Sequence, residues 1–232
     1  MSPQLPLALR FPADQRFQDF VGQAPVCAHV AAVAQGDSKA WLYLSGPSGS
    51  GKTHLLLAAC AEASEQRALY LPLPALAGRL AEALEGAESA GLVCVDGLDA
   101  SAGNRDDEIA LFHFHNRARA TATRVIYAAT AMPAALPFVV PDIVSRLEQC
   151  TRLALAPLDE SGRREVLTRR AARRGLELDD AVLDYLFRRV GRDLGTLTAL
   201  LDRLDRASLI AQRRITIPFL RPFLPTGDDP VR

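Results

Sequence analysis

The sequence predicts an α/β protein with a five-stranded parallel sheet, followed by a small helical domain. Three observations support this fold class. Short apolar runs alternate with helical patterns up to about residue 155, as in successive βαβ units. A glycine-rich loop follows the first apolar run, which is typical of an α/β domain that binds phosphates. After Pro157 the patterns are mainly helical, which indicates a second domain.

The strands and helices follow from these patterns in order. The predicted strands span residues 41–44, 68–71, 92–95, 124–129 and 151–155. The third is apolar throughout, as in a parallel strand buried on both faces. The predicted helices span 52–63, 75–84, 106–120, 159–174, 179–189 and a last segment from about 193. The expected domains are an extended N-terminal peptide at 1–12, an α/β domain at 13–157, a helical domain at 158–224 and a disordered tail at 225–232.

Composition limits the class of protein. Residues of hydrophobic type make up 49% of the chain and the formal net charge is zero. This apolar content supports a folded core, and the charge balance does not favour binding nucleic acid through bulk charge. Membrane-length apolar runs and signal-peptide features are missing, and the four cysteines lack metal-ligand spacing. We expect a soluble, cytoplasmic protein that does not bind membranes.

The segment Gly46–Thr53 has the full spacing of a P-loop. Backbone N–H groups of such a loop face phosphate oxygens, and the next helix adds its positive dipole end. Lys52 is expected to reach the β- and γ-phosphates, and the Thr53 hydroxyl to ligate Mg²⁺. A glycine-rich turn that only starts a helix is the alternative. The expected nucleotide contacts are Gly46, Pro47, Ser48, Gly49, Ser50, Gly51, Lys52, Thr53 and His54.

Asp96 directly follows the buried apolar run at 92–95 and is the second expected Mg²⁺ ligand. Many P-loop ATPases place another carboxylate next to it, which orients the attacking water. Gly97 occupies that position here, and Asp99 is expected to point elsewhere. The sequence therefore predicts nucleotide binding, with weak or absent hydrolysis by the chain itself.

Several segments resemble the AAA+ ATPase family of the replication initiator DnaA, and most closely its short Hda branch of DnaA inactivators. They are Gln4–Leu9, Gly51–Leu56, Val93–Asp96, Pro141–Leu147 and 201–219. The resemblance covers nearly the whole chain apart from the tail, and the P-loop alone would not select this family. It implies an AAA+ P-loop NTPase core with a helical lid. From the length of the chain we expect the AAA+ core alone, without the further domains of DnaA, including its DNA-binding domain.

The resemblance also implies a function, which is negative regulation of chromosomal replication initiation. Arg146 matches the family's arginine finger, which reaches the γ-phosphate on a neighbouring subunit and stabilises transition-state charge. The implied cofactors are ADP or ATP with Mg²⁺. The implied partners are DnaA and the sliding clamp, which is the β subunit of DNA polymerase III, with DNA and the nucleoid reached mainly through the clamp. A homodimer or a larger nucleotide-dependent oligomer is also implied.

The N-terminal peptide resembles the segment by which Hda binds the clamp. In an extended peptide Leu5, Leu7 and Leu9 point to one side, and Pro6 disfavours a helix. Gln4 can then form hydrogen bonds while the leucines fill an apolar groove. A terminal segment packed on its own domain is the alternative.

Three more positions match the family's nucleotide site, and a fourth departs from it. Phe20 and Val21 correspond to the adenine pocket, and Thr130 to the sensor 1 position. The position of the family's sensor 2 arginine is occupied by Gly195. Arg192, one turn earlier, is the candidate replacement. Two other hypotheses remain open: an autonomous DnaA-like or helicase-loader-like ATPase, and a non-catalytic clamp adaptor. The arginine-rich segment 163–174 is read either as a solvated helix face or as a surface for DNA or DnaA.

Overall fold

A computed structural model describes residues 15–63, 67–190, 194–211 and 215–224. The chain divides into two compact units between Ala156 and Pro157. None of the helices within the described ranges is both long and apolar enough to cross a membrane.

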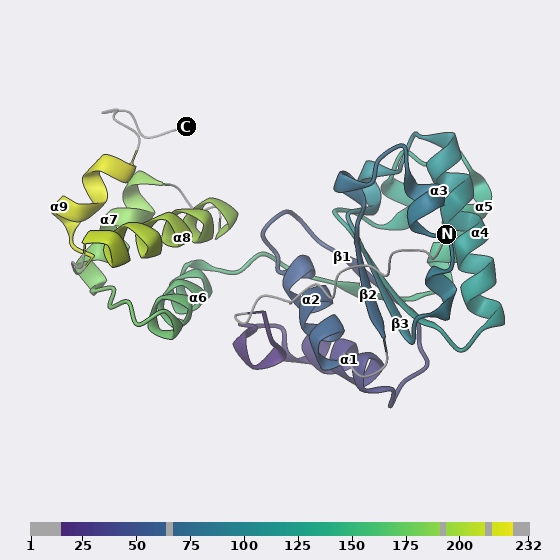
Figure 1. Ribbon diagram of the computed structural model, residues 1–232, viewed down its shortest axis with the longest axis horizontal. Coiled ribbons are helices and arrows are strands. Elements are labelled where there is room, and N and C mark those ends of the chain that lie inside the picture. The colour runs from purple at the N-terminus through teal and green to yellow at the C-terminus, as the bar shows by residue number, and fades with distance from the viewer. Residues whose placement is uncertain (1–14, 64–66, 191–193, 212–214, 225–232) are drawn as a thin grey trace, which may run out of the picture. The chain divides into compact units, whose positions relative to one another are not determined.

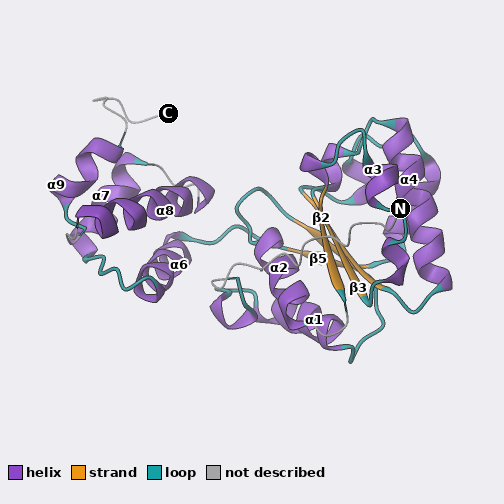
Figure 2. Cartoon of the chain, viewed as in Figure 1, coloured by secondary structure: helices purple, strands orange, loops and turns teal. Residues whose placement is uncertain are grey.

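The first unit contains a five-stranded sheet in the order β2-β3-β4-β1-β5, with every neighbouring pair parallel. Figure 2 shows the strands side by side. They are β1 (Leu42–Ser45), β2 (Ala68–Pro72), β3 (Leu92–Asp96), β4 (Arg124–Ala129) and β5 (Thr151–Ala154). This confirms the predicted parallel sheet. Because the strands run in one direction, the loops after β1, β3 and β4 meet at the same edge.

Helices cover both faces of the sheet (Figure 1). They are α1 (Ala24–Gln35), α2 (Lys52–Glu62), α3 (Leu80–Ala83), α4 (Arg105–Ala120) and α5 (Pro141–Glu148). The α1 and α2 face buries Val30, Leu55 and Leu44 in one core. The α3, α4 and α5 face buries residues such as Tyr43 and Phe114 in another. The sheet is therefore the middle of three layers.

The predicted helix at 75–84 is wrong. The structure has a 3-10 turn at Leu73–Ala75 and then the four-residue helix α3. Gly78 lies between them with a φ of 75°, in the left-handed region that a right-handed helix cannot include. The leucines at spacing four suggested a helix, but the backbone turns at this glycine.

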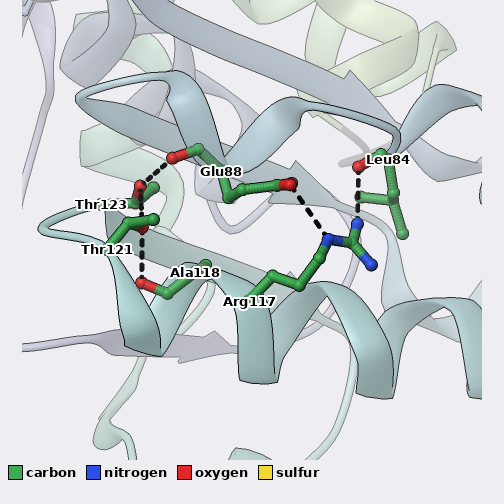
Figure 3. A network of polar contacts seen from close by, with 6 residues as sticks. All are labelled: Leu84, Glu88, Arg117, Ala118, Thr121 and Thr123. Carbon is green, nitrogen blue, oxygen red and sulfur yellow. Dashed lines mark hydrogen bonds and ion pairs between the residues drawn. The ribbon is translucent and has the colours of Figure 1, made fainter.

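Polar contacts connect α4 with the segment before β3, at the edge of the sheet where β3 and β4 begin (Figure 3). The Arg117 guanidinium lies 3.1 Å from a carboxylate oxygen of Glu88 and donates to the Leu84 carbonyl at 3.0 Å. The Thr123 hydroxyl donates to the Glu88 carbonyl at 2.6 Å and lies 2.7 Å from the Thr121 hydroxyl. These contacts fix the amino edge of the sheet, opposite the predicted phosphate site.

The second unit is a helical bundle. Its helices are α6 (Glu160–Arg173), α7 (Asp180–Arg189), α8 (Leu194–Ala211) and α9 (Ile217–Leu220). Their apolar faces form a core of their own, which includes Leu167, Leu186 and Leu204. This confirms the predicted small helical domain.

The arginine-rich helix α6 forms ion pairs within this unit. Arg164 contacts Glu160 and Asp184, and Arg169 lies 2.5 Å from Glu165. Two of these pairs join residues four apart on one helix face, which is the spacing that supports helices. These contacts agree with a solvated helix face.

Candidate nucleotide-binding site

The predicted P-loop connects the end of β1 with the start of α2. Lys52 is the first residue of α2, and its ammonium donates to the carbonyls of Gly46 at 2.5 Å and Pro47 at 2.9 Å. Ser50 Oγ is buried and has no hydrogen-bond partner among the described residues. The loop therefore curves around its own lysine, and it holds a buried hydroxyl whose hydrogen-bonding capacity is unused.

Gly51 joins the loop to α2 with a φ of 97°. A Cβ at this position would lie 2.7 Å from Cε2 of Phe20, so only glycine fits both the backbone conformation and the contact. Phe20 also packs edge-on against His54, with 5.5 Å between ring centroids. The His54 ring nitrogen Nε2 lies 2.9 Å from the Arg16 carbonyl. The structure thus brings Phe20 and His54 together beside the P-loop.

Val21 follows Phe20 and is buried. The segment then continues to Gln23, whose amide side chain bonds the backbone of Ala156 twice, at 2.9 and 3.0 Å. These bonds hold the start of α1 against the chain just after β5. They fix the segment that carries the two predicted adenine-pocket residues.

Asp96 and Thr53 meet at the carboxyl edge of the sheet. The Thr53 hydroxyl donates to Asp96 Oδ2 at 2.7 Å. The same carboxylate oxygen accepts a second hydrogen bond, from the Tyr70 hydroxyl at 2.8 Å. A hydroxyl and a carboxylate are the oxygen ligands that Mg²⁺ prefers. The two predicted metal ligands are therefore in direct contact with each other.

Burial shapes the electrostatics of the loop. It lowers the pKa of Lys52, while the carboxylates of Asp96 and Asp99 act in the opposite direction. Burial also raises the pKa of Tyr70, and the charge of Asp96 raises it further. Tyr70 consequently keeps its proton and remains a hydrogen-bond donor to Asp96 at physiological pH.

Thr130 lies just after β4, at the predicted sensor 1 position. Its backbone N–H donates to Asp99, with the nearer carboxylate oxygen at 3.0 Å, and its hydroxyl also donates to Asp99. A threonine hydroxyl has a single proton to donate. In this arrangement the proton is directed at Asp99. Asp99 thus pairs with the end of β4.

These residues fit a magnesium nucleotide. The donor set combines an ammonium, a helix N-terminus, the buried Ser50 hydroxyl and the oxygen ligands of Thr53 and Asp96. Such groups bind phosphate and a hard cation together. Among the described residues no cluster of three or more His, Cys, Asp or Glu side chains could hold a metal ion.

Arg146 lies on α5, away from the P-loop helix. Helices α4 and α5 pack on one face of the sheet and α2 on the other. The Arg146 guanidinium lies 6.0 Å from the centre of the Phe112 ring on α4. Its side chain is partly exposed. Arg146 is separated from the P-loop helix because α5 and α2 pack on opposite faces of the sheet.

Some predicted residues lie outside the described part of the chain. They are Gln4, Leu5, Leu7 and Leu9 of the N-terminal peptide and the candidate sensor residue Arg192, as well as the tail at 225–232. Gly195, at the matching sensor 2 position, is exposed in the first turn of α8.

Tyr70 is the site residue that sequence reasoning missed. Its signal was its position on the strand predicted at 68–71, but a tyrosine there reads as part of the core. Only the pairing of β2 with β3 shows that it reaches Asp96.

Comparisons with known proteins agree with the two units. Residues 159–224 match a family model described as the lid domain of Hda. AMPPCP-bound DnaA from Aquifex aeolicus has a TM-score of 0.69 and 22% identity, covering 84% of this chain and 66% of that one. Domain III of DnaA from Thermotoga maritima has a TM-score of 0.75 and 19% identity, covering 92% and 98%.

The RuvB branch migration motor of Thermotoga maritima is also similar, with a TM-score of 0.65 and 18% identity over 91% of this chain and 71% of that one. The chain spans 66% and 61% of the two DnaA structures that contain AMPPCP. At these identities the structural likenesses show the fold, which is that of an AAA+ core followed by a helical lid.

Proposed function

We infer that this chain is an AAA+ protein related to Hda and DnaA. From this premise we propose that it is a negative regulator of replication initiation. In this proposal it binds ADP or ATP with Mg²⁺ at its P-loop and stimulates hydrolysis of the ATP held by DnaA. An N-terminal peptide tethers it to the sliding clamp. The protein then works in the cytoplasm and reaches the nucleoid through the clamp.

One observation carries the proposal: the chain's phosphate site and its candidate arginine finger are separated. Thr53 and Asp96 meet beside the P-loop, whereas Arg146 lies on α5 against the other face of the sheet. An arginine placed in this way can reach a nucleotide held by a partner. Gly97 lacks the carboxylate that would orient water for the chain's own hydrolysis. The separation supports catalysis in trans, in a homodimer, a larger oligomer or a complex with DnaA.

In such a complex Arg146 would place a fixed positive charge against the γ-phosphate of the partner's ATP. Arginine fingers in other systems accelerate hydrolysis by about 10³ to 10⁵. The residues Gln4, Leu5, Leu7 and Leu9 would hold the protein on the clamp, which raises its effective concentration near DnaA on the same DNA. Lys52, Thr53 and Asp96 would hold the chain's own Mg²⁺-nucleotide.

The experiment follows ATP bound to DnaA. DnaA is loaded with labelled ATP and mixed with clamp-loaded DNA and this protein, either wild type or Arg146→Ala. Arg105→Ala, at an exposed position at the start of α4, is the matched control. We expect stimulation by wild type and the control, and a loss of at least about tenfold for Arg146→Ala. Removing residues 4–9 should abolish the dependence on the clamp.

Each rival has its own result in this assay. An autonomous ATPase would turn over ATP without DnaA. A non-catalytic adaptor would keep its full effect with Arg146→Ala. If wild type does not accelerate hydrolysis on DnaA, the proposed function fails.

A further inference from the structure

We infer that Tyr70 is a positioning residue for Asp96, the aspartate that would hold Mg²⁺ beside the P-loop. The Tyr70 hydroxyl donates to Asp96 Oδ2 at 2.8 Å. The inference rests on the Mg²⁺-nucleotide part of the proposed function, and it concerns how the metal ligand is oriented.

The sheet explains why a residue on β2 reaches a residue on β3. Tyr70 pairs with Cys94 in the parallel register, and Pro72 pairs with Asp96. Alternate residues of a strand share a face, so Tyr70, Cys94 and Asp96 all lie on the α2 side. The long phenol side chain crosses diagonally to the carboxylate two residues further along β3. A shorter side chain at position 70 would not reach it.

The hydrogen bond from Tyr70 can hold the Asp96 carboxylate in one orientation. A tyrosine phenol is protonated near neutral pH, so the Tyr70 hydroxyl donates its proton to Asp96 and does not compete for the metal. Asp96 Oδ2 also accepts from Thr53 at 2.7 Å. Thr53 is itself an expected metal ligand. Tyr70 has no such second role and can hold the carboxylate while Thr53 serves the ion.

Hydrogen bonds to a metal ligand affect the affinity for the metal. Groups that hydrogen-bond a metal ligand fix its orientation, and their loss typically costs about 10- to 100-fold in metal affinity or activity. A tyrosine that merely fills the core would instead affect folding and leave the Mg²⁺ requirement unchanged. The two roles can be separated by measuring Mg²⁺ dependence directly.

The test titrates a fluorescent ADP analogue into the full chain, in EDTA and over a range of MgCl₂ concentrations. Tyr70→Phe keeps the ring and removes only the hydroxyl. Tyr43→Phe is the matched control, because Tyr43 lies in the same sheet and donates to the carbonyl of Ala131 at 2.8 Å. We expect Tyr70→Phe to need about tenfold more Mg²⁺ for its half-maximal effect. Its ADP affinity in EDTA and the control's Mg²⁺ curve should match wild type.

A double variant shows whether Tyr70 acts through Asp96. In an Asp96→Asn background, Tyr70→Phe should cause no further change in the Mg²⁺ curve. An unchanged Mg²⁺ curve for Tyr70→Phe alone, an equal shift in both backgrounds, or a loss of ADP affinity in EDTA would each overturn the inference. A wild-type protein whose ADP binding ignores Mg²⁺ would overturn the proposed metal site as well, so the two failures are distinguishable.

Discussion

At the scale of single residues, Gly97 shows why a missing catalytic group cannot simply be restored. Its φ is 77°, and a Cβ at this position would lie 2.9 Å from Cδ of Pro74. A carboxylate side chain here meets both backbone strain and a steric clash. The position that many P-loop ATPases use to orient water is closed in this fold by a neighbouring proline.

Replacing Gly97 by glutamate should therefore destabilise the protein without creating an ATPase. Gly86→Glu is the matched control, because Gly86 has a φ of 74° and a Cβ there would meet nothing within 4 Å. Both variants should lose about 1–2 kcal/mol of stability, because a non-glycine residue is strained in the left-handed backbone region. We expect Gly97→Glu to lose about 1–3 kcal/mol more in urea unfolding, because of the clash. Rapid ATP turnover by Gly97→Glu at wild-type stability would contradict this.

His115 makes stability depend on pH. Its ring is buried beside the Tyr127 hydroxyl, and burial, followed by the charges of Arg119 and Arg146, lowers its pKa from 6.5 to about 4. The unfolded chain therefore binds this proton more readily than the folded one. Stability is fully present above pH 6.5 and is lost as the pH falls towards 4.

The effect can be measured by urea unfolding between pH 7 and pH 4. At roughly 1.4 kcal/mol per pKa unit, wild type should lose about 2–3 kcal/mol more over this range than His115→Gln. His113→Gln, which changes an exposed histidine on the same helix, should retain the wild-type slope. Equal slopes for wild type and His115→Gln would refute the assignment.

At the scale of elements, Glu108 fixes the segment that precedes the arginine-bearing helix. This fully buried carboxylate on α4 accepts from the backbone N–H groups of Gly103 at 2.7 Å, Val139 at 2.9 Å and Val140 at 2.7 Å. The latter two residues directly precede α5. The start of α5 is thus held by a side chain from the neighbouring helix.

Glu108→Gln should loosen this segment, because the amide group turns a donor towards backbone donors. We expect a loss of about 2–3 kcal/mol in stability and faster hydrogen exchange at the amides of Val139 and Val140. Asp106→Asn, at an exposed position in the same helical turn, is the control and should change neither. Unaltered exchange at residues 139 and 140 in Glu108→Gln would show that the carboxylate does not hold the segment.

The sequence best predicted those elements whose structure is determined by one continuous segment of the chain. The P-loop and α2 follow from one continuous segment, so their residues and order could be predicted. The helix expected at 75–84 failed because Gly78 breaks a good leucine pattern. Helix α1 was not predicted, since its alanine-rich stretch carries only a weak apolar periodicity. The Tyr70–Asp96 contact depends on the register of β2 and β3, which no local pattern specifies.

At the scale of the whole molecule, two separate cores suggest that nucleotide stabilises the units differently. Trp41, the chain's single tryptophan, is buried in the first unit. Gly195, at the start of α8, has no side chain that could bind a phosphate. We expect Mg²⁺-ADP to stabilise mainly the unit that contains the P-loop.

Unfolding followed by Trp41 fluorescence should therefore respond to nucleotide. At ADP about 100-fold above its Kd, the free energy of unfolding should rise by about 2.7 kcal/mol. The part of the circular dichroism transition that comes from the helical unit should move less. In Lys52→Ala the fluorescence shift should vanish, and a full shift in that variant would argue that ADP binds elsewhere.

Lys52 makes the phosphate loop suitable for chemical labelling. The chain has only two lysines, Lys39 and Lys52, and burial in the loop lowers the pKa of Lys52, which leaves more of its amine in the nucleophilic form. A reagent that acylates amines therefore has two side chains to modify, and one of them lies in the phosphate loop. The ratio of the two labelled peptides in a mass spectrum would report directly whether a phosphate group covers that amine, with Lys39 as the internal standard.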